Sequence, residues 1–182
     1  MIITRAALSD VDTIMSWRRE RTAWLATRGE DQWSIPLPRS AVAATVSAGQ
    51  TWMVWDDHVA TGTITLAAAT DATGSGSRRT TRQTRSGIQG RSGGRALRGE
   101  DDPLVHSGDG LGGELLDWAG GRAYAAGLTW LRLDAWTTNE KLHDYYRQLG
   151  FRHVRTVESR ISGACFQRAA QPYDGRLKTD GG

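Results

Sequence analysis

The stretch LRLDAWTTNEKLHDYYRQLGF (residues 131–151) decides the fold, because its periodicity changes halfway along. Its first part alternates, with Leu131 and Leu133 on one side and Arg132 and Asp134 on the other, which is typical of a half-buried strand. Its second part carries apolar residues at helical spacing, namely Leu142, Tyr145, Tyr146 and Leu149, and Gly150 follows as a C-terminal stop. The stretch therefore predicts a strand, a short loop and a helix.

The segment SGDGLGGELL (residues 107–116) predicts a glycine-rich loop that leads into another helix. Glycines before a helix leave backbone N–H groups uncovered, and the helix dipole adds positive potential there, so such a loop suits phosphate. The segment is neither a dinucleotide-binding fingerprint nor a P-loop, since no clear strand precedes it and Gly-Lys-Ser/Thr is absent. A flexible turn into a helix is the alternative interpretation.

Shorter patterns predict the remaining elements. A first strand is expected within residues 1–7, and a helix is expected to follow with Ser9 as its N-cap and Gly29 as its end. A second helix is expected at residues 40–48, two strands at residues 51–66 around an Asp56-Asp57 turn, and two more strands within residues 151–159 and 163–169. The order predicts a single mixed α/β domain over residues 1–170, with a polar tail at 171–182 that is expected to fray.

The composition predicts a soluble protein of one domain. The chain has 182 residues, enough for a core of its own, and it contains no apolar run near 18 residues and no basic-then-apolar leader, so a cytoplasmic location away from membranes is expected. Cys165 is the only cysteine, which excludes an internal disulfide and a thiolate metal cluster. The four histidines show no ligand spacing, and His143 is expected beside the apolar stripe of its helix, so no metal is expected.

The glycine loop and the strand–loop–helix stretch, in this order, resemble the GNAT superfamily of N-acetyltransferases. In that family a Gln/Arg-x-x-Gly-x-Gly/Ala loop opens a helix, a strand follows, and an Asn-x-x-Ala/Leu-x-x-Phe/Tyr-Tyr-x-x-x-Gly-Phe segment comes next. Gly110-Leu111-Gly112 matches the core of the first motif, although Ser107 stands where many members have Gln or Arg. The second motif is matched at every spacing by Asn139, Leu142, Tyr145, Tyr146, Gly150 and Phe151. The resemblance covers about residues 1–66 and 107–168.

The resemblance implies a mixed central sheet flanked by helices and direct transfer of an acetyl group from acetyl-CoA to a primary amine of a small molecule or peptide. It implies that backbone amides bind the pyrophosphate at Gly108, Asp109, Gly110, Leu111, Gly112 and Gly113. It also implies that Asn139 contacts the pantetheine arm and that Tyr146 protonates the departing thiolate. Taken alone, the residues favour Asn139 as an N-cap and Tyr146 as core packing. A homodimer is left open.

Residues 69–105 depart from the family pattern. Apolar periodicity is lost there, and residues 71–99 hold seven arginines against Asp71, a net of +6 in a chain whose net charge is +3. In the family, the strand before the pyrophosphate loop pairs its backbone with the pantetheine. That strand is expected to be missing or scrambled here, and the segment to be disordered, because central strands are built from apolar side chains.

Two origins of this segment are considered. Reading Gly93 to Asp102 one base later allows Glu-Asp-Ala-Leu-Tyr-Val-Glu-Lys-Met-Ile, so one hypothesis is a pair of compensating frameshifts that impaired a normal strand. A true insertion is the alternative.

Two further functions are weighed against acetyl transfer. A noncatalytic acyl-CoA-binding protein would use the same scaffold without turnover. A nucleic-acid-binding arm would use the arginine-rich segment, but residues 71–99 contain no Phe or Tyr to stack on bases, so no nucleic-acid partner is expected.

Overall fold

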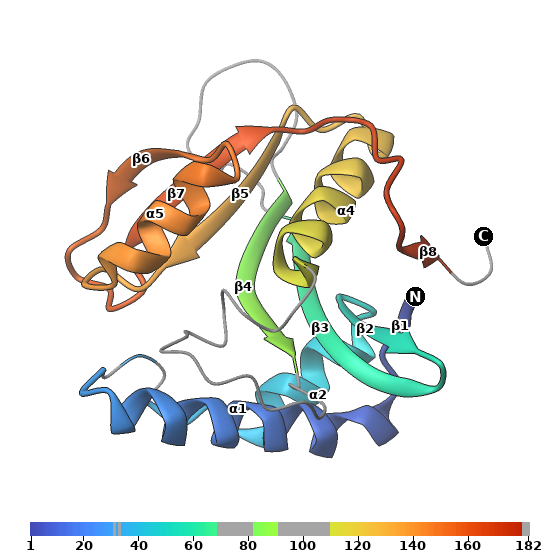
Figure 1. Ribbon diagram of the computed structural model, residues 1–182, viewed down its shortest axis with the longest axis horizontal. Helices are drawn as coiled ribbons and strands as arrows, with labels where there is room; N and C mark the ends of the chain where they lie inside the picture. Colours follow the sequence, from blue (N-terminus) through green and yellow to red (C-terminus); the bar gives the residue numbers. More distant parts are fainter. Residues whose placement is uncertain (31, 33, 69–81, 91–109, 180–182) are drawn as a thin grey trace. The chain divides into compact units, whose positions relative to one another are not determined.

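A computed structural model describes residues 1–30, 32, 34–68, 82–90 and 110–179, with residues 82–90 described by their backbone (Figure 1). The chain forms two compact units. The first comprises Met1–Thr65, Gly87–Leu111 and Leu177–Gly182, and the second comprises Leu66–Ser86 and Gly112–Arg176. Among the described residues, no helix has the length and apolar character needed to cross a membrane.

The first unit contains a mixed sheet. β1 (Ile2–Arg5) pairs antiparallel with β2 (Thr51–Asp56) and parallel with β8 (Lys178–Thr179). β3 (Val59–Ala68) pairs antiparallel with the other edge of β2, so the order is β8-β1-β2-β3. Asp57 and His58 connect β2 to β3 with φ angles of 43° and 68°, the left-handed backbone that a two-residue hairpin turn needs. The turn therefore lies one residue later than expected.

Two helices accompany this sheet. A single 3-10 turn, η1 (Leu8–Asp10), leads into α1 (Val11–Thr27), and α2 (Arg39–Ser47) follows. The expected N-cap role of Ser9 is wrong, because the carboxylate of Asp10 accepts a hydrogen bond from the backbone N–H of Ala7 at 2.7 Å and the α-helix begins after that turn. Gly29, with a φ of 72°, follows the end of α1 as predicted.

The core of the first unit joins the two helices to the sheet. It is an apolar cluster made of Ala6, Val11, Ile14, Trp17, Val42, Val46 and Met53. Burying apolar surface stabilises a fold by about 25 cal/mol per Å². Val11, Ile14 and Trp17 recur every three residues, so they lie on one face of α1. That face belongs to the same buried cluster as Met53 of β2.

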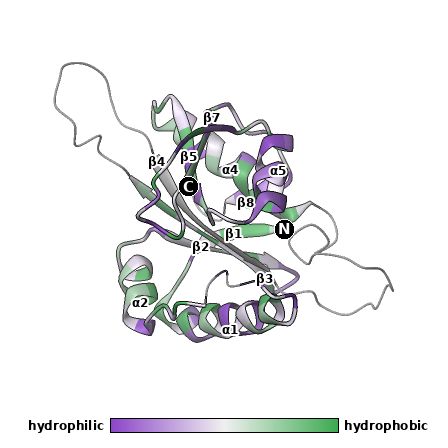
Figure 2. Ribbon diagram, turned by 90° about the vertical axis from the view of Figure 1, so that its left-hand side faces the viewer, coloured by the Kyte–Doolittle hydropathy of each residue, from purple (hydrophilic) through white to green (hydrophobic). Residues whose placement is uncertain are grey.

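The second unit contains the strand order β6-β7-β5-β4 and two helices. β5 (Trp130–Ala135) pairs parallel with β4 (Arg82–Gly90) and antiparallel with β7 (Ala164–Ala169), and β6 (Arg152–Thr156) pairs antiparallel with β7. The helices are α4 (Leu111–Ala125) and α5 (Glu140–Gln148). α5 is coloured mostly hydrophilic in Figure 2, and its buried residues are Leu142, His143 and Tyr146.

Both helices of the second unit pack on the same face of its sheet. The ring centroid of Phe166 on β7 lies 5.3 Å from that of His143 and 5.9 Å from that of Tyr146, both on α5. Arg168, two residues further along β7 and hence on the same face, pairs with Asp117 of α4 at 2.7 Å. The fully buried Leu133 lies opposite Phe166 and completes this apolar face.

A strand is present where one was expected to be missing. β4 pairs with β5 in the register Arg82–Leu131, Gln83–Arg132 and Thr84–Leu133. The expectation of a missing strand is corrected for residues 82–90, because strand pairing uses backbone N–H and C=O groups that a polar sequence supplies as well as an apolar one. Residues 69–81 and 91–105, including the Gly93–Asp102 stretch of the frameshift hypothesis, lie outside the described residues.

The C-terminal segment does not fray from Gln171, and that expectation is wrong for residues 171–179. In the second unit, the Tyr173 hydroxyl donates a hydrogen bond to Glu114 of α4. In the first unit, Leu177 is buried and β8 pairs with β1. These partners are far away in sequence, so the polar composition of the tail could not predict the contacts with them.

Candidate functional site

The described part of the glycine loop meets α4 at Gly110. Gly110 has a φ of 70°, a left-handed backbone angle that favours glycine, and Leu111 begins the helix with its side chain buried. Gly108 and Asp109 lie outside the described residues, so their predicted contacts stay predictions.

The first turn of α4 presents backbone donors beside small residues. The N–H groups of residues 111–114 have no carbonyl four residues earlier within the helix. Gly112 and Gly113 are partly exposed. A methyl group at Gly113 would lie 3.2 Å from Cδ2 of Leu149, so glycine lets this turn approach the end of α5 closely. The turn has the geometry of an anion-binding helix start.

Glu114 is the one acidic side chain in this first turn, and it is held by the C-terminal segment. Its Oε1 accepts hydrogen bonds from the Tyr173 hydroxyl and from the backbone N–H of Arg176, the latter at 2.9 Å. Its Oε2 lies 3.7 Å from Nε of Arg176. Part of its negative charge is therefore compensated, which lowers its repulsion of an anion at the helix start.

Asn139 caps α5. Its Oδ1 accepts a hydrogen bond from the backbone N–H of Leu142 at 2.9 Å, which confirms the N-cap interpretation. The cap uses the oxygen of the side-chain amide, so a pantetheine contact would have to use the nitrogen. That contact stays a prediction.

Tyr146 lies in the apolar interior of the second unit. It is 3% exposed, and its ring centroid lies 5.9 Å from those of both Phe151 and Phe166. The predicted packing role is confirmed. The predicted role as an acid toward a thiolate is not tested by this packing, and it would have to be exerted by the Tyr146 hydroxyl.

His143 does not lie where the sequence pattern predicted it. It is buried on α5, with Nε2 2.8 Å from the backbone oxygen of Trp136 and Nδ1 3.4 Å from Oε1 of Glu140. The expectation that it lies beside the apolar stripe is wrong, because the strand-end carbonyl gives its ring a buried polar partner. Within the described ranges no group of three or more His, Cys, Asp or Glu side chains could hold a metal ion.

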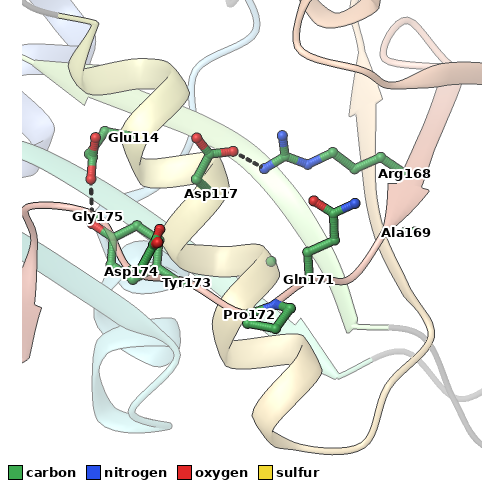
Figure 3. A pocket seen from close by; sticks show the side chains of 10 residues that line it. Glu114, Asp117, Arg168, Ala169, Gln171, Pro172, Tyr173, Asp174 and Gly175 are labelled. Carbon is green, nitrogen blue, oxygen red and sulfur yellow. Dashed lines mark hydrogen bonds and ion pairs between the residues drawn. The ribbon is translucent and has the colours of Figure 1, made fainter.

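A polar pocket of about 250 Å³ lies between α4 and the C-terminal segment (Figure 3). Its lining includes Glu114, Asp117, Arg168 and residues 171–175. Arg168 pairs with Asp117, donates to the backbone oxygen of Leu149 at 3.0 Å, and lies 4.7 Å from the ring centroid of Phe151. Arg168 thus ties β7 to both helices, and this role was missed because its partners are remote in sequence.

The other face of the second unit's sheet is polar. Arg132 and Asp134 on β5 lie opposite Gln167 and Cys165 on β7, and Arg155 on β6 lies opposite Cys165. Nε of Arg132 donates to Oε1 of Gln167 at 3.1 Å. We call these five residues the polar strand face. The period-two pattern of residues 131–135 predicted its β5 members.

The charges of this face change the pKa of the Cys165 thiol. Burial raises the pKa of Cys165, and the negative charge of Asp134 and a hydrogen bond with it raise that pKa further. Contacts with Arg155 act in the opposite direction on the same pKa. Cys165 therefore lies between a carboxylate and a guanidinium.

The ladder between β4 and β5 covers three residue pairs and ends at Thr84 and Leu133. β5 continues to Ala135, so Asp134 is its first residue beyond the ladder. Chain continuity leads from there through Trp136 to the Asn139 cap of α5. The short segment from Asp134 to Asn139 therefore joins the polar strand face to the second motif.

Several solved structures with this arrangement are described as acetyltransferases. A GNAT-family acetyltransferase from Listeria monocytogenes aligns with 92% of this chain and 94% of its own, at 16% identity and a TM-score of 0.68. One from Streptococcus agalactiae aligns over 93% and 95%, at 16% identity and a TM-score of 0.66. The PaiA N-acetyltransferase from Thermoplasma acidophilum, in complex with coenzyme A, aligns over 92% and 97%, at 14% identity and a TM-score of 0.63. No protein-family model and no curated protein matches the chain.

The chain has the GNAT acetyltransferase fold. Its mixed α/β architecture, with a mixed sheet flanked by helices, matches these structures, as the family resemblance implied. At 14–16% identity, the likeness establishes the fold.

Proposed function

We propose that the protein transfers an acetyl group from acetyl-CoA to a primary amine of a small molecule or peptide. The observation that carries the proposal is the start of α4, where Gly110, Gly112 and Gly113 accompany first-turn amides that the helix itself does not pair, in a GNAT fold. A cytoplasmic location is part of the proposal, and a homodimer stays open. No nucleic-acid or membrane partner is proposed.

The residues at the helix start fit the pyrophosphate of acetyl-CoA. Glycine at positions 110, 112 and 113 leaves no side chain to block an approaching phosphate, and the backbone amides with the helix dipole provide its counter-charge. Glu114, the nearby acidic group, is engaged by Tyr173 and Arg176. Asn139 would contact the pantetheine arm through its side-chain nitrogen while its oxygen keeps the cap.

The proposed reaction needs no covalent enzyme intermediate. The neutral amine nitrogen forms a bond to the thioester carbonyl carbon, the carbon–sulfur bond breaks, and the amine loses one proton while the departing thiolate gains one. Tyr146 is proposed to supply the proton to sulfur. Its hydroxyl is positioned by a ring that Phe151 and Phe166 hold in place.

A noncatalytic acyl-CoA-binding protein is the second candidate. The observation that favours it is the burial of Tyr146, which is 3% exposed. On this alternative, the hydroxyl contributes only to packing. Binding of acetyl-CoA would then persist with no amine acetylated.

Calorimetric titration with acetyl-CoA tests the binding step. Gly112→Pro removes one first-turn N–H at a place where helices tolerate proline, and the Kd should rise about 10- to 100-fold, the range for losing a hydrogen bond to a charged group. Ser40→Pro is the matched control, because Ser40 is also the second residue of its helix, α2, and should leave Kd unchanged.

Release of coenzyme A across a panel of amines then separates the two candidates. Turnover with any amine supports the enzyme, and binding without turnover supports the noncatalytic protein. Absence of acetyl-CoA binding by the unmodified chain would refute both.

A further inference from the structure

Residues 173–176 of the C-terminal segment lie against α4 within the second unit (Figure 3). The Tyr173 hydroxyl and the backbone N–H of Arg176 both donate to Oε1 of Glu114, and Nε of Arg176 lies 3.7 Å from Oε2 of the same carboxylate. The side chain of Glu114 is only 20% exposed, so water has little access to compensate its charge. The segment therefore supplies most of the surroundings of a carboxylate in the turn proposed to bind pyrophosphate.

The close fit between the segment and α4 depends on glycines in both. Gly121 lies in the middle of α4, where glycine disfavours a helix relative to alanine. A Cβ at Gly121 would collide with Cβ of Tyr173, and a Cβ at Gly175 would collide with the Glu114 carboxylate. Because α4 gives up helix propensity where the segment needs room, the docked position is specified by the sequence of both partners.

The charge at the start of α4 depends on this docking. Glu114 is the acidic side chain of the first turn, so its charge repels an anion bound to the amides of that turn. The docked segment brings the positive charge of Arg176 to this carboxylate. Asp117, one turn further along α4, has its own cation in Arg168 at 2.7 Å. When residues 173–176 leave α4, Glu114 keeps its negative charge and loses the cation that the segment supplies.

We infer that docking of the C-terminal segment and binding of acetyl-CoA are coupled through Glu114. The docked segment tightens acetyl-CoA binding, because Tyr173 and Arg176 reduce the repulsion between Glu114 and the pyrophosphate. By linkage, bound acetyl-CoA holds the segment on α4 more firmly by the same factor. Tyr173 and Arg176 are then positioning residues, which act through Glu114 and not by contact with acetyl-CoA. The inference rests on the proposed function for the place of the pyrophosphate, and it applies equally to an enzyme and to a noncatalytic binder.

A double-mutant cycle, measured by calorimetric titration with acetyl-CoA, tests the effect of the segment on binding. Arg176→Gln removes the cation and keeps the backbone N–H that donates to Glu114, so the Kd should rise about two- to five-fold, the range for an exposed ion pair. Glu114→Gln leaves no charge to compensate. In that background, Arg176→Gln should change the Kd by less than about 1.5-fold. The effect in the first background should shrink as salt is added, because salt screens exposed charges.

Glu158→Gln and Arg160→Gln, alone and together, form the matched control cycle. Both residues are exposed in the connection between β6 and β7, and the two substitutions make the same charge changes as the test pair. They should leave the Kd unchanged. An equal rise of the Kd for Arg176→Gln in both Glu114 backgrounds would mean that Arg176 contacts acetyl-CoA directly, and it would overturn the inference. An unchanged Kd in both backgrounds would overturn it as well.

Trypsin cleavage after Arg176 tests the effect of binding on the segment, because the protease needs residues 173–176 to leave α4. Mass spectrometry of the released C-terminal peptide gives the rate. Saturating acetyl-CoA should slow this cleavage at least about two-fold in the unmodified protein. In Glu114→Gln the ratio of rates with and without acetyl-CoA should be close to one. Equal slowing in Glu114→Gln would overturn the inference, because the protection would then come from stabilisation of the whole protein by its ligand.

The titration of the unmodified chain separates the failure of this inference from the failure of the proposed function. Absence of acetyl-CoA binding would refute the proposed function and the coupling together. Binding with equal effects of Arg176→Gln in both backgrounds, or with equal protection in Glu114→Gln, would overturn the coupling alone and leave the proposed function standing.

Discussion

Glu114, in the first turn of α4, accepts a hydrogen bond from the hydroxyl of Tyr173, which lies 59 residues later in the chain. The same carboxylate accepts the backbone N–H of Arg176. One side chain therefore fastens the C-terminal segment to the helix whose start is the candidate pyrophosphate site. The stability of that segment and the electrostatics of the site depend on one residue.

Loss of this carboxylate should loosen the C-terminal segment. Glu114→Ala removes two hydrogen bonds, and the free energy of unfolding should fall by about 1–3 kcal/mol. Limited proteolysis should cut within residues 171–179 faster than in the unmodified protein. Tyr173→Phe removes only the hydroxyl bond and should have about half the effect. Equal proteolysis rates in all three proteins would contradict a fastening role for Glu114.

The two adjacent glycines of α4 should respond oppositely to alanine. A Cβ at Gly121 would lie 2.2 Å from Cβ of Tyr173, whereas a Cβ at Gly120 would lie 3.7 Å from Nη2 of Arg168. Gly121→Ala should therefore displace the C-terminal segment and destabilise the protein. Gly120→Ala should stabilise it by up to about 1 kcal/mol, the helix propensity difference between glycine and alanine. Thermal unfolding of the pair checks this, and a higher midpoint for Gly121→Ala would contradict it.

The capping and cofactor roles of Asn139 can be separated. Asn139→Ala loses the bond to Leu142 and should cost about 1 kcal/mol of unfolding free energy. Asn139→Asp keeps an oxygen cap but replaces the side-chain nitrogen, so stability should be retained while the Kd of acetyl-CoA rises. An unchanged Kd in a stable Asn139→Asp variant would leave Asn139 as a cap alone.

The hydroxyl of Tyr146 should matter to turnover more than to stability. Tyr146→Phe keeps the contacts with Phe151 and Phe166, so unfolding free energy should change by less than about 1 kcal/mol, whereas kcat should fall about 100-fold if the hydroxyl is the acid. Tyr146→Ala leaves a cavity and should cost about 3–5 kcal/mol. An unchanged kcat in Tyr146→Phe would favour a packing role only.

The Cys165 thiol should be less reactive than an ordinary exposed thiol near neutral pH. Burial and Asp134 raise its pKa, so the thiolate fraction at a given pH is reduced. Asp134→Asn removes a factor that raises the pKa, which should move the alkylation profile to lower pH. Arg155→Ala removes a factor that lowers the pKa and should move the profile to higher pH. Shifts of the same sign in both variants would contradict the placement of Cys165 between these charges.

The element order and the second motif were readable from the sequence because their signals are local. Alternation over residues 131–135 predicted β5, and helical spacing from Leu142 to Leu149 predicted α5. The Asn139 cap and the glycine at position 150, with a φ of 79°, confirm the boundaries of that helix. Each of these signals depends on residues only a few positions apart, because the side-chain pattern of a strand or helix repeats over that distance.

Long-range partners could not be predicted in the same way. The composition of residues 69–105 predicted no strand, yet β4 pairs with β5 through its backbone, whose hydrogen-bonding groups are the same in every sequence apart from proline. The polar tail predicted fraying, yet Tyr173 and β8 find partners on α4 and β1.

By itself, then, the sequence determined the elements, the two motifs and the GNAT fold that they imply, because periodicity and capping act between near neighbours. Only the tertiary structure decided that Glu114 holds the C-terminal segment, that His143 is buried against Trp136, and that Asp134 lies beside Cys165. The physical reason is that these contacts depend on strand register and helix packing, which join residues that no local pattern relates.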